Sequence, residues 1–134
     1  MEIFEPYATT NIVLGVSGLL FFLQLLVADV VSIKTGHPPG VAVEQTHDSL
    51  LFRASRAFAN SNESVGIFIL FVLFAIFSAA DAAWVNGFSL VYFIGRVAHM
   101  VFYYANLKLL RSVAFAVSCV GLLGIFVAGV RYYI

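Results

Sequence analysis

Cysteine, charge and histidine are scarce in this chain of 134 residues, and each shortage excludes a class of protein. The single cysteine, Cys119, excludes an internal disulfide and a cysteine-rich metal site. Because Cys119 lies in an apolar run, we expect it to be a small buried side chain. Only 10% of residues are charged, seven basic against seven acidic, so no net charge would attract nucleic acid. The three histidines lack a metal-like spacing, and we expect no metal site.

Hydrophobic sequence is what the chain has in excess. It is 62% hydrophobic with a mean hydropathy of +1.00, whereas a soluble domain is roughly 45–50% apolar. A helix of about 20 residues crosses the hydrocarbon core of a bilayer. The segments that qualify are residues 10–33, 62–80, 88–106 and 110–132. We therefore predict an all-α membrane protein, a single domain over residues 1–134 built as a bundle of four transmembrane helices.

Local sequence signals refine this prediction. Thr9, Thr10 or Asn11 is a candidate N-cap for the first helix. The second span continues a helix that starts near residue 48 with a polar first third. Gln24, a lone polar residue in the first span, is expected to bond across helices rather than bind a ligand. Four glycines are expected to allow close approach between helices, namely Gly15, Gly18, Gly121 and Gly124.

The distribution of basic residues predicts an orientation, because cytoplasmic loops are enriched in Lys and Arg. The first loop and the helix start after it carry Lys34, Arg53 and Arg56, and the third connection carries Lys108 and Arg111. These ends should face the cytosol, with both termini across a bacterial inner membrane or the endoplasmic reticulum. The opposite end carries aromatic residues that suit the membrane interface, namely Tyr7, Trp84, Tyr132 and Tyr133.

Two helical segments carry polar side chains at spacings of three and four residues, so each set shares one helical face. The first set consists of Arg56, Asn60 and Glu63. The second set consists of Arg96, His99 and Tyr103. Ionisable groups at membrane depth are costly and normally face a bundle interior, a cavity or a partner. The two stripes therefore predict a polar site between helices.

The chemistry of such a site follows from its arginines, whose planar forks of donors suit carboxylates and phosphates. They outnumber Glu63, which predicts an anionic ligand. Glu63 itself could pair with an arginine or receive an ammonium group of that ligand. Some arginines, Arg53 above all, can instead reach lipid phosphates. Arg111 and Ser112 begin the last helix, where the helix N-terminus and the guanidinium would raise the thiolate fraction of a bound thiol. Ser112 can also be a simple cap, and His99 a packing residue.

These same residues carry a resemblance to a known family. Residues 56–63, Arg-Ala-Phe-Ala-Asn-Ser-Asn-Glu, resemble the second-helix pattern Arg-Ala-x-x-Asn-x-x-Glu of the MAPEG family, the membrane-associated proteins of eicosanoid and glutathione metabolism. Residues 95–103, Gly-Arg-Val-Ala-His-Met-Val-Phe-Tyr, are similar to the third helix of its microsomal prostaglandin E synthase branch. Residues 111–113, Arg-Ser-Val, are similar to the start of that branch's fourth helix. Order, spacing and the four-span layout agree over nearly the whole chain.

The resemblance implies a homotrimer that binds glutathione between neighbouring subunits near the cytosolic side. Arg56, Asn60 and Glu63 would hold glutathione from one subunit. The residues that would complete the site from the neighbour are Arg96, His99, Tyr103, Arg111 and Ser112. Arg111 or Ser112 would stabilise the thiolate. Glutathione has two carboxylates, one ammonium and one thiol, which matches the ligand expected from the charges.

The sequence also departs from the prostaglandin synthase branch, which argues against prostaglandin synthesis. Ala59 stands in place of an arginine, Phe115 in place of a tyrosine, and the connection before Arg111 is one residue shorter. We therefore predict a glutathione transferase or peroxidase, or an isomerase, of detoxification type. Its thiolate would attack a lipophilic electrophile or hydroperoxide from the bilayer. The alternatives are a non-catalytic scaffold with the same fold and a small four-span transporter.

Overall fold

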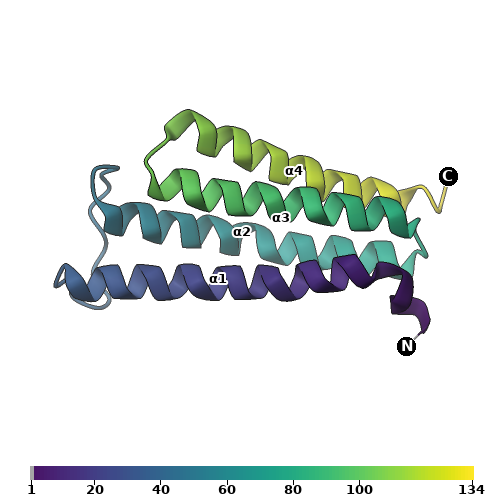
Figure 1. Cartoon of the computed structure of the whole chain (residues 1–134), viewed down its shortest axis with the longest axis horizontal. Helices are drawn as coiled ribbons and strands as arrows, with labels where there is room; N and C mark the ends of the chain where they lie inside the picture. The colour runs from purple at the N-terminus through teal and green to yellow at the C-terminus, as the bar shows by residue number, and fades with distance from the viewer. Residues whose placement is uncertain (1) are drawn as a thin grey trace.

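The computed structural model describes residues 2–134, and all regular structure in that range is helical. The elements are η1 (Glu2–Tyr7), a 3-10 helix, and the α-helices α1 (Ala8–Lys34), α2 (Leu50–Phe77), α3 (Ala82–Tyr104) and α4 (Lys108–Val130). The helices run up and down, and both chain termini lie at the same end (Figure 1). All four are long and apolar enough to cross a membrane, which confirms the predicted class of fold.

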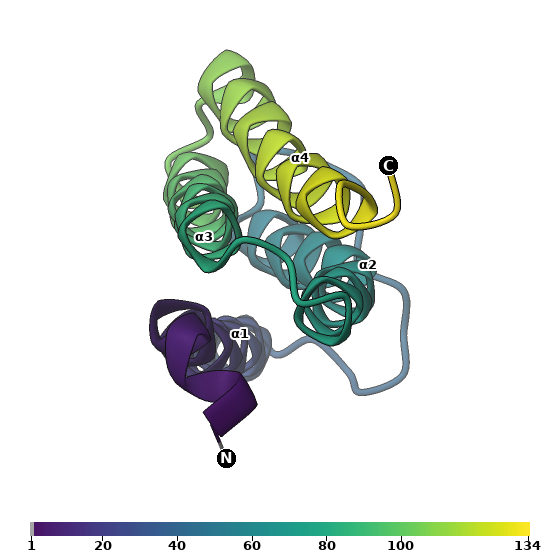
Figure 2. The same ribbon diagram turned by 90° about the vertical axis from the view of Figure 1, so that its right-hand side faces the viewer.

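The arrangement of the helices places α2 and α3 at the centre of the bundle. Each of them contacts both α1 and α4, and the contact between α3 and α4 is the most extensive. Seen from the end that carries the termini, α4 lies over α2 and α3 while α1 lies on their other side (Figure 2). Side chains that α2 and α3 turn inward are therefore the ones that two or more helices can enclose.

The start of α1 differs from the prediction, because no residue of its own first turn caps it. The helix begins at Ala8, directly after η1, and its N-cap residue Tyr7 makes no side-chain cap. Asn86 of α3 supplies the acceptor instead: its Oδ1 accepts from the Thr10 backbone N–H at 3.0 Å and from the Thr10 hydroxyl at 2.8 Å. Asn86 Nδ2 also donates to the carbonyl of Pro6 at 2.9 Å. The proposed N-caps were wrong because a neighbouring helix satisfies these backbone donors.

Glycines explain how closely α3 and α4 approach. A Cβ atom added to Gly95 would lie 2.6 Å from the backbone nitrogen of Ser118. A Cβ added to Gly121 would lie 2.5 Å from the backbone nitrogen of Tyr92. Because both obstacles are main-chain atoms of the facing helix, any larger residue would force the two helices apart. This is the small-residue packing that stabilises helix pairs in membranes, where lipid offers no hydrophobic driving force.

The expected role of the four glycines was correct for two of them. Gly121 meets the α3 backbone, and a Cβ at Gly124 would overlap the ring of Phe88. A Cβ at Gly15 or Gly18 would meet nothing within 4 Å in the described chain. These two do not bring helices of this chain together, because a glycine in an apolar run does not reveal which side of the helix faces another helix.

The interior changes character along the bundle. Towards the end with the termini its buried polar side chains are small hydroxyls, and the Phe68 and Tyr92 rings stack there with centroids 4.2 Å apart. Further along, the fully buried side chains of α1, α2 and α3 include Gln24, Ser61 and Arg96. A polar interior is exceptional in a membrane bundle and marks a functional region. The half of the bundle that holds these polar residues is therefore where a site is to be sought.

Candidate functional site

A chain of hydrogen bonds joins three helices around a buried arginine. Arg96 of α3 is 0% exposed. Its Nη1 donates to Asn60 Oδ1 at 3.2 Å, and its Nη2 donates to Ser61 Oγ at 3.0 Å. The Ser61 hydroxyl lies 2.8 Å from Gln24 Oε1, to which it donates. Gln24 thus bonds across helices, as expected, and the chain fixes the orientation of the Arg96 guanidinium.

The positive charge of Arg96 is held by neutral partners. Asn60 and Ser61 both accept through uncharged oxygens. Arg96 Nε is buried and finds no acceptor among residues 2–134. An uncompensated charge inside a protein is strongly unfavourable. A guanidinium so placed, with donors left over, is suited to receive an anion.

A small cavity lies between α2 and α4, and Asn60, a hydrogen-bond partner of Arg96, is part of its lining. Its volume is about 130 Å³. Its lining consists of Asn60, Glu63, Ser64, Ile67, Phe115, Ser118, Cys119 and Leu122. Two residues of the predicted site, Asn60 and Glu63, therefore share one opening. Glu63 is exposed, so its carboxylate can meet a ligand.

Cys119 belongs to the lining of this cavity, and its predicted burial was wrong. The thiol side chain is exposed. Its neighbour Ser118 is 1% exposed and packs against Gly95 of α3, so Cys119 occupies a different face of α4. An apolar run shows how deep a residue lies in the membrane but not which face it occupies, which is why the prediction failed.

A second cluster surrounds Arg111, at the end of the bundle where α3 ends and α4 begins. The Arg111 guanidinium carbon lies 4.4 Å from the centre of the Tyr103 ring, a cation–π distance. Arg111 Nη1 lies 3.1 Å from Nδ1 of His47. The His47 ring also packs edge-on against Phe52, with centroids 5.1 Å apart. The side chain predicted to stabilise a thiolate is thus held between an aromatic ring and a loop histidine.

His47 is a member of this cluster that the sequence did not reveal. It comes from the loop before α2, sixty-four positions away from Arg111, and no spacing rule links the two. Burial of the ring, and then the positive charges of Arg111, Lys108 and Arg53, hold the pKa of His47 below its ordinary value; Asp48 opposes them. At neutral pH the imidazole is therefore uncharged and can accept from a guanidinium.

Arg53 fastens the loop that carries His47. Its Nε donates to the carbonyl of Tyr104 at 3.2 Å, at the end of α3. Its Nη1 donates to the carbonyls of His47, at 2.6 Å, and Asp48, at 3.0 Å. The predicted contact with lipid phosphates is therefore replaced by a structural role. Arg53 binds the start of α2, the loop and the end of α3 into one unit.

His99 connects the two clusters. It is 4% exposed and lies one helical turn from both Arg96 and Tyr103. Its ring centroid lies 5.2 Å from that of Tyr103 and 6.1 Å from that of Phe115. His99 Nδ1 is buried without a hydrogen-bond partner in the described part of the chain. The stripe predicted on α3 is thus a continuous buried polar face, and His99 both packs in it and retains a polar atom for a ligand.

Two predicted residues lie apart from these clusters. Arg56 is exposed on α2. Ser112 is exposed, and its hydroxyl donates to the carbonyl of Lys108 at 3.2 Å. The helix starts at Lys108, earlier than predicted, and its N-cap residue is Leu107. Ser112 is therefore in the second turn and is not a cap, which weakens the expected effect of the helix N-terminus on a ligand near it.

Two residues that were expected in different subunits meet within this chain. The resemblance placed Asn60 and Arg96 in different subunits, but they are hydrogen-bonded to each other within this chain. Both therefore belong to one wall. Glu63 lines the same cavity as Asn60 and is therefore next to that wall.

Four membrane-spanning helices around a buried basic site define a multi-pass integral membrane protein of the small helix-bundle class. The sequence profile of the MAPEG family matches residues 11–131, and the chain belongs to that family. No individual curated protein matches this sequence. The family includes glutathione transferases and peroxidases as well as members without catalytic activity.

Proposed function

We propose that the protein is a glutathione-dependent membrane transferase or peroxidase. The observation that carries this proposal is the fully buried guanidinium of Arg96, which is bonded to neutral oxygens only. Its positive charge favours the binding of an anion, and the neighbouring side chains determine which anion fits. Glutathione offers two carboxylates for Arg96 and Arg111 and an ammonium for Glu63. Asn60 accepts from Arg96 through Oδ1, so its Nδ2 remains available to donate to a carboxylate.

The chemical role belongs to Arg111. A guanidinium has five N–H donors, and His47 engages only one of its terminal nitrogens. The remaining donors and the positive charge would favour the thiolate of glutathione over the thiol and lower its pKa. The thiol proton would pass to water. The thiolate, rather than a protein side chain, would then be the nucleophile, so catalysis would come from positioning and charge stabilisation.

Two reactions follow from such a thiolate. With an electrophile, a carbon–sulfur bond forms and the leaving group departs or the adduct is protonated. With a hydroperoxide, the thiolate attacks the O–O bond and releases an alcohol after protonation. The resulting sulfenic acid then condenses with a second glutathione to give the disulfide and water. A lipophilic second substrate would come from the bilayer, past the exposed Leu, Val and Phe residues of α4.

The exposure of Glu63 supports an oligomer, and the number of three subunits comes from the family resemblance. This carboxylate is exposed about halfway along α2 (Leu50–Phe77), a helix long enough to span the membrane. Facing lipid there would be costly. We propose that neighbouring subunits cover this face and enclose the ligand, and that the Lys- and Arg-rich end of each subunit faces the cytosol.

The test is a glutathione titration of the detergent-solubilised protein, followed by the ultraviolet absorbance of the thiolate. The wild-type protein should show a saturable thiolate signal at neutral pH, and Arg111→Ala should lose it while the oligomer persists. Lys34→Ala, an exposed residue at the same end, serves as the control and should behave like the wild type. A full thiolate signal in Arg111→Ala would rule out the role given to Arg111.

A non-catalytic scaffold is the second candidate, because the family contains such members. It would keep the bundle and bind a lipid or protein partner without using a thiol. Titration calorimetry separates the two candidates. Absence of glutathione binding to a correctly assembled protein would favour the scaffold.

A further inference from the structure

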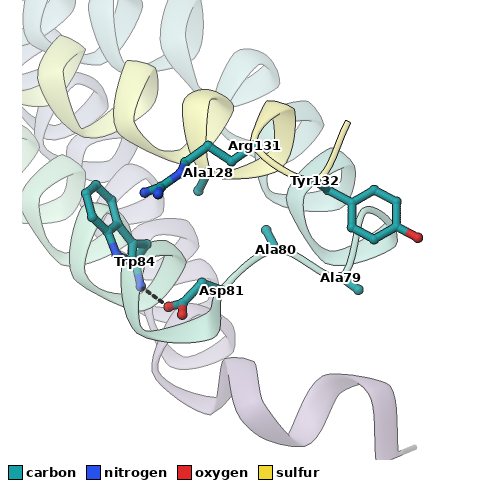
Figure 3. A pocket seen from close by; sticks show the side chains of 7 residues that line it. All are labelled: Ala79, Ala80, Asp81, Trp84, Ala128, Arg131 and Tyr132. Carbon is teal, nitrogen blue, oxygen red and sulfur yellow. Dashed lines mark hydrogen bonds between the residues drawn. The ribbon is translucent and has the colours of Figure 1, made fainter. Parts of the chain in front are cut away.

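A cavity of about 290 Å³ opens at the far end of the bundle, where both termini lie. It is formed where α2 ends, α3 begins and α4 ends. Its lining consists of Ala79, Ala80, Asp81, Trp84, Ala128, Arg131 and Tyr132 (Figure 3). None of these residues belongs to the proposed glutathione site, which lies towards the opposite end.

The cavity is lined by one basic and one acidic side chain, and both contact the same tryptophan. The Arg131 guanidinium carbon lies 5.1 Å from the centre of the Trp84 ring. Asp81 Oδ1 accepts from the backbone N–H of Trp84 at 3.1 Å, which caps α3. Figure 3 shows the guanidinium above the opening and the carboxylate below it. Each charge is thus fixed by Trp84, and Arg131 keeps its N–H donors and Asp81 its second oxygen for a ligand.

An apolar groove continues from this cavity along α3. The groove has a volume of about 410 Å³ and is lined by Ala83, Trp84, Gly87, Phe88 and Val91, so Trp84 belongs to both hollows. A Cβ added to Gly87 would meet nothing within 4 Å in the described chain, so glycine keeps the groove open. The ten residues of α3 from Ala82 to Val91 rise about 15 Å. That is half of a hydrocarbon core about 30 Å thick, the depth of a single leaflet.

We propose that these two hollows bind one phospholipid whose headgroup carries a phosphate and a primary ammonium, as phosphoethanolamine does. The phosphate is bound by Arg131 and the ammonium by Asp81, while an acyl chain lies in the groove beside Gly87. A primary ammonium suits this site because it donates hydrogen bonds to a carboxylate, which a quaternary ammonium cannot do. The aromatic ring at the junction suits the level of the membrane interface.

The chain contains its own probe, because Trp84 is its only tryptophan. The full-length protein is reconstituted into phosphatidylcholine vesicles that contain increasing amounts of phosphatidylethanolamine with brominated acyl chains, which quench tryptophan fluorescence on contact. The expected quenching saturates at a small mole fraction of the brominated lipid. Brominated phosphatidylglycerol or phosphatidylcholine is expected to quench only in proportion to its abundance.

Single substitutions test which side chain contacts which part of the lipid. Arg131→Gln and Asp81→Asn each remove one charge, and asparagine can still cap α3. Each should raise the half-saturating fraction of phosphatidylethanolamine about tenfold, the value of one hydrogen bond to a charged group. Gly87→Leu should abolish saturation by filling the groove. Glu5→Gln, an exposed carboxylate at the same end, is the control and should leave the curve unchanged.

Three outcomes would overturn the proposal. Equal quenching by all three brominated lipids would mean that Trp84 contacts bulk lipid only. Protection of Trp84 from every brominated lipid would mean that a second copy of the chain covers this face. Relief of quenching by water-soluble glycerophosphoethanolamine, at concentrations that match the lipid, would mean that the site binds a free headgroup. Glutathione takes no part in the measurement, so its result is independent of the proposed function.

Discussion

Arg111 and His47 form a direct contact, with Nη1 of the arginine 3.1 Å from Nδ1 of the histidine. A guanidinium can only donate, so Nδ1 must be the acceptor and the imidazole must be neutral, with its proton on Nε2. Through this contact a loop residue fixes the direction of the side chain proposed to stabilise the thiolate. Arg53 holds the same loop by its backbone, so the geometry of Arg111 depends on the loop as a whole.

The first prediction concerns pH. Because the pKa of His47 is lowered in the folded protein, the unfolded chain binds this proton more readily and stability rises with pH. The contribution is complete above the ordinary value of 6.5 and is lost as the pH falls through the lowered pKa. Thermal unfolding in detergent should show this loss for the wild type. In His47→Gln the loss should be smaller than in the wild type, while His37→Gln, in the same loop, should show the full loss.

The second prediction separates binding from stability at Arg96. A buried charge that no acidic side chain bonds carries a desolvation cost, which an apolar side chain of similar length avoids. Arg96→Met should therefore keep or raise the unfolding temperature without ligand but lose glutathione binding. Arg96→Lys keeps the charge but not the fork that bonds Asn60 and Ser61, and should raise the dissociation constant about tenfold. Titration calorimetry measures both constants.

Arg56→Lys makes the same change as Arg96→Lys, but at an exposed arginine of the predicted stripe, and it serves as the control. In one subunit its side chain lies on the surface, so any effect on affinity would have to come through a neighbouring subunit. If Arg96→Met bound glutathione as tightly as the wild type, the buried guanidinium would not be the anion site.

The sequence predicted the parts of the structure that depend on periodicity. Long runs of Val, Leu and Phe predicted four spans, because an apolar helix of this length crosses the hydrocarbon core of a bilayer. Spacings of three and four brought Arg96, His99 and Tyr103 onto one face, and all three are buried there. Depth along a helix, and whether polar residues share one face of it, are local properties that spacing can reveal.

Contacts between different helices could not be predicted from such patterns. His47 reaches Arg111 only because the loop folds back over the end of the bundle. Cys119 was expected to be buried and is exposed, since the facing helix and not the composition of the run decides which side is covered. Ser112 was expected at the helix start and lies in the second turn, because α4 begins directly after the turn at Asn106. The first two errors come from tertiary geometry, and the third comes from a turn that shifts the helix start.

The exposed thiol of Cys119 provides the third prediction. It lines the same cavity as Asn60 and Glu63, so a ligand in that cavity should shield it. A membrane-permeable maleimide should label Cys119 in the wild-type protein, and S-methylglutathione, which lacks a free thiol, should slow the labelling several-fold. Mass spectrometry of the intact chain measures the rate.

The control moves the thiol by one position. In the double variant Cys119→Ser with Val120→Cys, the new cysteine lies at an exposed residue that is not part of the cavity lining. Its labelling should not respond to S-methylglutathione. Equal protection at both positions would show that the ligand changes the whole assembly rather than covering the cavity.

The last prediction tests how α3 and α4 are held together. A methyl group at Gly121 would lie 2.5 Å from the backbone nitrogen of Tyr92, an obstacle that no side-chain rotation can remove. Gly121→Ala should therefore destabilise the bundle by about 1–3 kcal/mol, the usual cost of overpacking. Gly18→Ala makes the same change on α1 where a Cβ meets no described atom within 4 Å, and should be neutral or slightly stabilising because alanine favours helix. Unfolding in mixed micelles with increasing denaturing detergent compares the two. Equal stability of both variants would mean that α3 and α4 can separate without cost, and that the buried position of Arg96 does not depend on their contact.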